Sequence, residues 1–77
     1  MATDQIHPGM LVVSLDGEPV GEVKEIRNDA FLVDRPLKTD IFIPFDIVER
    51  IVTADHSVVL KMPKWEVDRT RFEIPPL

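Results

Sequence analysis

The chain contains no cysteine among its 77 residues, which excludes the disulfide frameworks of small secreted domains as well as thiolate metal sites. It has no apolar run close to the roughly 18 residues of a membrane span, and no basic segment followed by an apolar one at its amino terminus. Basic side chains are scarce, because nine Lys and Arg stand against 14 Asp and Glu, for a net charge of −5. That charge opposes binding to nucleic-acid backbones and to anionic lipid. We therefore expect a cytoplasmic protein with no nucleic-acid partner and no direct membrane insertion.

The length predicts a single domain over residues 1–77, since nothing is left for a second core. Burial in so small a core only narrowly offsets the conformational entropy lost on folding. We therefore expect the chain to form a homodimer or to dock on a protein partner.

Short runs rich in valine and isoleucine recur along the chain and predict β-strands. Turn-forming residues separate them, mainly Gly, Asn, Asp and Pro. The runs cover residues 10–15, 20–27, 30–34, 41–45, 47–53 and 57–62. Strand edges in such a chain must be hidden, and curling of the sheet hides most of them. The predicted fold is all-β: a small, strongly bent β-barrel of five to six short antiparallel strands.

Helix is expected at one place only, a short turn near residues 46–50. Asp46 is a candidate N-cap there, and Glu49, three residues later, completes a capping-box pattern. Residues 63–77 differ from the barrel core at about 8–62, because prolines flank them and their apolar residues are isolated. We expect these residues to form an irregular C-terminal appendage.

The segment with the highest density of acidic and glycine residues, DGEPVG at positions 16–21, is the first candidate for a site. Counted as a calcium loop from Asp16, it places Val20 at position 5 and Arg27 at position 12, where oxygen ligands are required. Phosphate-binding glycine patterns are absent too. We therefore interpret Asp16 and Gly17 as a hairpin corner. Gly21 is interpreted as a bend in the next strand, where a bulge would restore the inward alternation of its apolar residues.

Residues with catalytic or metal-binding chemistry are few and scattered. His7 and His56 are the only imidazoles, and a metal site would need carboxylates from distant loops beside them. Ser14 and Ser57 lie in predicted strands without a glycine elbow, so we expect ordinary solvent-facing hydroxyls. The sequence predicts no enzyme, no catalytic residue, no cofactor and no assigned metal ligand. A second hypothesis stays open, in which acidic loops bind a small molecule or a divalent cation.

Trp65, Phe72 and Ile74 are the candidate interface residues of the appendage. Tryptophan is typical of binding hot spots, so these residues could anchor a contact with a partner. The other interpretation is that Trp65 and Phe72 cover the open end of the barrel. The charges between Glu66 and Glu73 vary in sign and are most simply a solvated face.

Three stretches, GMLVVSLDGEPVGEVKEI, IFIPFDIVERI and SVVLKM, resemble the PRC-barrel superfamily, and within it the small stand-alone bacterial proteins of uncharacterised function. The resemblance covers roughly residues 8–62. It rests on an apolar strand, an Asp-Gly turn, a Val-Gly-x-Val strand and an Ile-Pro stretch that runs through a valine into another strand. The matching residues are Asp16, Gly17, Val20, Gly21, Val23, Ile43, Pro44, Phe45, Val48 and Ile51.

The resemblance implies a strongly bent β-barrel in which Asp16, Gly17, Gly21 and Pro44 are turn or bend positions. It also implies a non-enzymatic role as an interaction or adaptor module. Related domains form the cytoplasmic part of a photosynthetic reaction-centre subunit and the carboxy-terminal part of a ribosome maturation factor that docks on a ribosomal protein. Neither of these specific functions is carried over to this chain.

Overall fold

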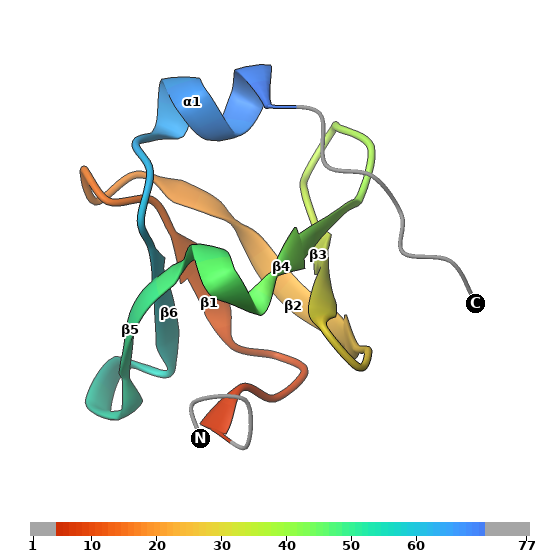
Figure 1. The fold of residues 1–77 in the computed structure, drawn as a ribbon, viewed down its shortest axis with the longest axis vertical. Coiled ribbons are helices and arrows are strands. Elements are labelled where there is room, and N and C mark those ends of the chain that lie inside the picture. The colour runs from red at the N-terminus through yellow and green to blue at the C-terminus, as the bar shows by residue number, and fades with distance from the viewer. Residues whose placement is uncertain (1–4, 71–77) are drawn as a thin grey trace.

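The computed structural model describes residues 5–70, which form one curled, mixed β-sheet with a short α-helix across one end (Figure 1). The all-β, barrel-like fold class is confirmed. The strands are β1 (Leu11–Val13), β2 (Pro19–Ile26), β3 (Ala30–Asp34), β4 (Ile41–Pro44), β5 (Val48–Val52) and β6 (Ser57–Leu60). The helical elements are η2 (Phe45–Ile47), η3 (Thr53–Asp55) and α1 (Lys64–Arg69).

The sheet is curled because its two edge strands are consecutive in the sequence. The strand order is β4-β3-β2-β1-β6-β5, so β4 and β5 lie at opposite edges. Only the three residues of η2 connect them, and a connection this short cannot cross a flat sheet of six strands, whose neighbours are about 4.8 Å apart. The sheet therefore bends until its edges approach each other, which gives a half-barrel.

One pair of strands departs from the predicted antiparallel arrangement. β1 and β6 run parallel, with Leu11 opposite Ser57 and Val13 opposite Val59, while the other four pairings are antiparallel. A chain of hairpins alone would have given only antiparallel neighbours. The expectation was wrong here because the η2 connection carries the chain across to the other edge, so that β6 returns alongside β1.

The core fills the concave side of the half-barrel. Valines dominate it, in agreement with the β-branched composition of the strands. Phe31 stacks against the half-buried Phe45 with ring centroids 5.5 Å apart, and this contact joins β3 to η2. The buried hydrophobic cluster consists of Ile6, Met10, Val12, Val20, Val23, Phe31, Val33, Ile43, Val58, Leu60 and Val67.

β2 contains a bulge beside Gly21. Val12 lies opposite Gly21 and Val13 opposite Pro19, so Val20 is the extra residue of the pairing. A side chain at Gly21 would collide with the Asp34 carbonyl of β3 and with the Val33 side chain. Glycine is therefore required by the close approach of β3, while its neighbour Val20 points into the core.

The predicted helical turn is present but shorter, since η2 ends at Ile47 and residues 48–50 already belong to β5. Pro44 occupies the N-cap position of η2, and no side chain caps this turn. The predicted Asp46–Glu49 capping box is therefore wrong. The reason is that Pro44 continues the extended backbone of β4, so the turn starts two residues earlier than a cap at Asp46 requires.

The start of the expected irregular appendage is α1, which lies across the end of the half-barrel (Figure 1). Val67 is buried in the core cluster and closes this end, whereas Trp65 is 61% exposed. Sequence analysis missed the helix because its own N-cap, Pro63, makes no side-chain cap. Of the helices in residues 5–70, none has the length and apolar character needed to span a bilayer.

Candidate functional site

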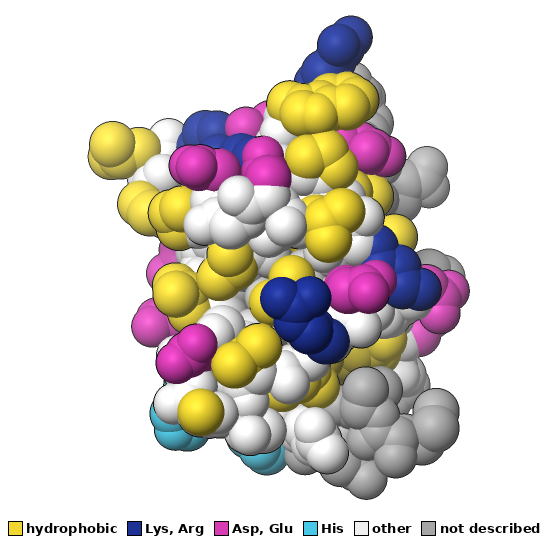
Figure 2. Space-filling model, turned by 90° about the vertical axis from the view of Figure 1, so that its left-hand side faces the viewer, with side chains coloured by type: hydrophobic (Ala, Val, Ile, Leu, Met, Phe, Trp, Pro, Cys, Tyr) yellow, Lys and Arg dark blue, Asp and Glu magenta, His cyan; other side chains and the backbone are white. Residues whose placement is uncertain are grey.

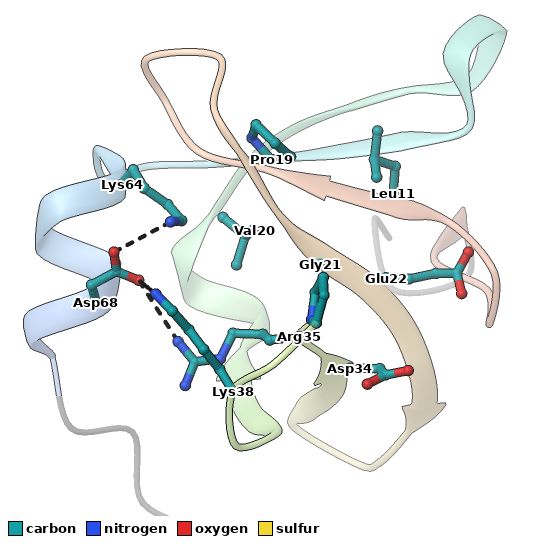
Figure 3. Close-up of a pocket in the computed structure, with 11 residues that line it drawn as sticks. Leu11, Pro19, Val20, Gly21, Glu22, Asp34, Arg35, Lys38, Lys64 and Asp68 are labelled. Carbon is teal, nitrogen blue, oxygen red and sulfur yellow. Dashed lines mark hydrogen bonds and ion pairs between the residues drawn. The ribbon is translucent and has the colours of Figure 1, made fainter.

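A groove of about 460 Å³ lies between β2, α1 and the loop that follows β3 (Figure 3). Its apolar part comes from Leu11, Pro19, Val20 and Gly21, all on β1 and β2. Its remaining lining is almost entirely charged. This volume lies in the range of small-ligand pockets, which combine an apolar surface with a few placed polar groups.

Three cations converge on one carboxylate at the α1 end of the groove (Figure 3). Asp68 lies 3.3 Å from the Lys64 amine, 3.4 Å from the Lys38 amine and 3.7 Å from the Arg35 guanidinium. The Arg35 side chain is only 13% exposed, and its Nε donates a hydrogen bond to the Thr39 carbonyl at 2.8 Å. With three cations against one carboxylate in the groove lining, this end carries a surplus of positive charge, which Asp16, outside the lining, offsets in part at Lys64.

The pKa of the Asp68 carboxyl reflects this surrounding charge. Partial burial raises the pKa and is the largest single influence, but the hydrogen bonds and charges of Lys64 and Lys38 together outweigh it. The net result is a pKa below the ordinary value of an aspartate. Asp68 is therefore ionised at neutral pH and acts as the internal counter-ion of the basic end.

Two carboxylates lie at the other end of the groove. Glu22 on β2 is directly opposite Asp34 on β3, and both line the groove. Figure 3 shows them on the far side of Gly21 from Asp68, with their carboxylates turned away from the basic end. Neither makes an ion pair within residues 5–70, and like charges directly opposite on neighbouring strands repel. The groove is thus positive at one end and negative at the other.

Leu37 is an exposed apolar residue at the rim, between the lining residues Pro36 and Lys38. Its side chain is fully exposed, and its backbone has a φ of 60°. This left-handed conformation costs a residue with a Cβ roughly 1–2 kcal/mol. The loop therefore holds a leucine in an unfavourable conformation where it gains no burial against the described residues 5–70.

Asp16 does more than form a hairpin corner. Its carboxylate accepts a hydrogen bond from the Ser14 hydroxyl and another from the Lys64 backbone amide at 3.1 Å. The second bond satisfies one of the free amides at the start of α1, so the β1–β2 turn fixes the helix that borders the groove. Sequence reasoning missed this role because 48 positions separate the two residues.

The other predicted turn positions have clear local roles. Gly17 has a φ of 85° in the β1–β2 turn, where glycine avoids steric strain. Pro44 ends β4 and is the N-cap residue of η2. Of the predicted interface residues, Trp65 is exposed on α1 but does not line the groove. Phe72 and Ile74 lie outside the described residues.

The histidines and serines do not form a reactive cluster. His7 and His56 are exposed, and His56 has a left-handed backbone in the β5–β6 turn. The expectation of solvent-facing serines was wrong, because Ser14 and Ser57 are both buried. The Ser14 hydroxyl is held between the Asp16 carboxylate and the Glu18 backbone amide. Among residues 5–70, no three His, Asp or Glu side chains are grouped so that they could hold a metal ion.

Hydrophobic side chains are also present on the side of the molecule that carries β5 and β6. Figure 2 shows them interspersed with charged side chains. The groove differs from this side because its charges are separated by sign around an apolar centre. Sequence analysis did not find it, since its residues come from four separate stretches and Asp68 was interpreted as part of a solvated face.

Residues 6–68 match a family described as an uncharacterized protein conserved in bacteria (DUF2171). The chain belongs to this family. The matched range includes every residue that lines the groove.

The chain is also similar to a ribosome maturation factor, RimM, from Limosilactobacillus fermentum. The two are 33% identical over 60 residues, which cover 70% of this chain and 36% of that protein. The chain therefore corresponds to little more than a third of this relative.

Proposed function

We propose that this protein is a non-enzymatic interaction module of the PRC-barrel type, which docks on a protein partner through the groove between β2 and α1. The observation that carries the proposal is the groove itself, in which an apolar centre lies between ends of opposite charge. Interfaces of this kind gain affinity from a desolvated apolar centre and gain orientation from complementary charge.

The similarity to the ribosome maturation factor supports a partner connected with ribosome assembly, in the cytoplasm. The net charge of −5 disfavours direct binding to the RNA backbone. Contact with a ribosomal particle would therefore be made through one of its proteins.

Self-association remains a separate prediction. The small core favours a homodimer, in which burial between two copies would add to the stability of each. Light scattering at micromolar concentration measures it directly, because the dimer has twice the 8.8 kDa mass of the chain.

The docking proposal is tested by affinity capture from the native cytoplasm with three versions of the full chain. The groove variant is Lys38→Glu, and the matched control is Lys24→Glu. Lys24 is also an exposed lysine paired with an aspartate, Asp40, at 3.1 Å, but it does not line the groove.

We expect the wild type and Lys24→Glu to capture the same protein, and Lys38→Glu to lose it. Co-sedimentation of the captured complex with ribosomal subunits would support the connection with ribosome assembly. Capture that is equal in all three versions would show that the groove is not the docking surface. Failure of the wild type to capture any protein would contradict the proposed function.

A further inference from the structure

We propose that the occupant of the groove is an extended peptide segment of the partner, with an acidic side chain at the Asp68 end and a basic side chain at the Glu22 end. The inference rests on the proposed function and specifies the chemistry of the partner. It follows from the arrangement of charges along the groove and from the apolar surface between them.

The basic end has capacity for a second carboxylate. Lys38, Lys64 and Arg35 all use Asp68 as counter-ion, at distances between 3.3 and 3.7 Å. These distances are longer than the roughly 2.7–2.9 Å of close charge-assisted hydrogen bonds, so the three cations share Asp68 loosely. A carboxylate from a partner would provide the additional negative charge that this end lacks.

The acidic end lacks a positive charge, which a basic side chain of the partner would supply. Glu22 and Asp34 are register partners on β2 and β3, and both carboxylates point away from the basic end (Figure 3). Neither has an ion-pair partner within the described residues. A cation placed between the two carboxylates would remove their repulsion. This pair also distinguishes a peptide from a simple anion, because inorganic phosphate or a nucleic-acid backbone would gain nothing from carboxylates at one end of its site.

The centre of the groove favours contact with apolar side chains of the occupant. Leu11 and Pro19 line it and are both exposed, so they provide apolar surface. β2 is an interior strand with β1 and β3 on either side, so its backbone hydrogen bonds are already used. Recognition must therefore come from side chains, with charges at both ends and small apolar residues between them.

The arrangement predicts opposite effects for two substitutions at the same end. Lys38→Ala removes a cation that attracts the acidic side chain of the peptide, and it should weaken binding by about two- to fivefold, the range for a partly exposed ion pair. Asp68→Asn removes the competing internal carboxylate, and it should strengthen binding by a similar factor. A purely structural role for Asp68 would produce weaker binding in both variants.

The test is an NMR titration of the ¹⁵N-labelled full chain with acetylated, amidated peptides. Each peptide has a glutamate and a lysine at its two ends, with two or four alternating valine and glycine residues between, and both orders are made. The controls are the same peptides with glutamine at both ends, inorganic phosphate, and the Lys24→Ala variant.

We expect one order of the charged peptide to shift the amides of Gly21, Glu22 and α1. The glutamine peptides should bind more weakly, and Lys24→Ala should behave as wild type. Shifts that are absent, or that spread over the whole molecule, would overturn the inference. Equal binding of the charged and the glutamine peptides would also overturn it. So would phosphate that reproduces the peptide shifts, because the groove would then bind an adventitious ion only. If the peptides fail while affinity capture remains sensitive to Lys38→Glu, the groove is still the docking surface and only its proposed occupant is wrong.

Discussion

At the scale of single residues, Leu37 combines an unfavourable backbone conformation with a fully exposed apolar side chain. It occupies a left-handed backbone conformation and buries none of its side chain. Within the described residues His56 is the only other non-glycine residue with positive φ. A fully exposed leucine that costs folding energy beside a groove is the arrangement expected of a residue whose burial occurs only on binding.

Replacing Leu37 with asparagine should therefore stabilise the free protein. Asparagine tolerates the left-handed conformation, and no buried contact is lost, so we expect a gain of about 1 kcal/mol. A change of that size raises the midpoint of thermal unfolding by roughly 4–8 °C in a domain of this length. Circular dichroism or scanning calorimetry measures the shift.

Leu15→Asn is the matched control. Leu15 is half exposed, but its backbone has ordinary negative φ, so the same substitution should leave stability nearly unchanged. Equal effects at the two positions would contradict the strain at Leu37. The Leu37→Asn variant should also capture less partner, since it loses apolar surface at the rim of the groove.

Residue identities predicted the local turns better than the site. Asp16 and Gly17 pointed to a turn because their types are typical of hairpin corners, and the bulge beside Gly21 lies where the spacing of Val20 and Val23 required one. The hydrogen bond from the Lys64 amide to Asp16 could not be predicted, because it depends on two segments that meet only in the folded chain.

At the scale of elements, the stability of α1 depends on the β1–β2 turn. α1 has six residues, and isolated helices this short are unstable in water. It is held by Val67 in the core, by the Asp16 carboxylate at its first amide and by the ion pair of Lys64 with Asp68. The Arg35 and Lys38 contacts with Asp68 then join the loop after β3 to the same helix.

The dependence of α1 on Asp16 predicts a change of stability with pH. The hydrogen bond from Ser14 lowers the pKa of Asp16 most strongly, burial opposes it, and the Lys64 amide and charge lower it further. Because the folded pKa lies below the unfolded one, the contribution is fully present above the unfolded pKa, near pH 4. It is lost as the pH falls through the folded pKa.

Asp16→Asn should therefore lower the midpoint of thermal unfolding at pH 7 and have a smaller effect in strong acid. Asp46→Asn is the control, since Asp46 lies in the first turn of η2 but makes no capping hydrogen bond there. Unfolding measured between pH 2 and pH 7 tests the expectation. A difference between Asp16→Asn and wild type that does not change with pH would rule out the proposed charge dependence.

The strands could be predicted from composition, but α1 could not. Runs of Val and Ile indicated all six strands because β-branched residues in short segments leave few alternatives. Residues 64–69 contain a single buried apolar residue, Val67, so they show no helical periodicity. Tertiary contacts stabilise this helix, because the local sequence provides neither a side-chain cap nor a repeating apolar face.

At the scale of the whole molecule, the groove exists because the sheet is curled and α1 crosses its end. β2 provides the centre, α1 and the loop after β3 provide the basic end, and Glu22 with Asp34 provides the acidic end. The sequence indicated the half-barrel and suggested a protein partner. It did not indicate the groove. The chain as a whole has more acidic than basic residues, so its composition gave no sign of the excess of basic side chains at the α1 end of the groove.

The central claim is that a partner protein occupies the groove between β2 and α1. Hydrogen–deuterium exchange of the full chain, alone and with the partner obtained by affinity capture, tests it most directly. We predict slower exchange at residues 19–22, 35–38 and 64–69 in the complex, with little change at the β5–β6 turn, residues 53–56. Protection confined to β5 and that turn, with unchanged exchange around the groove, would contradict the claim.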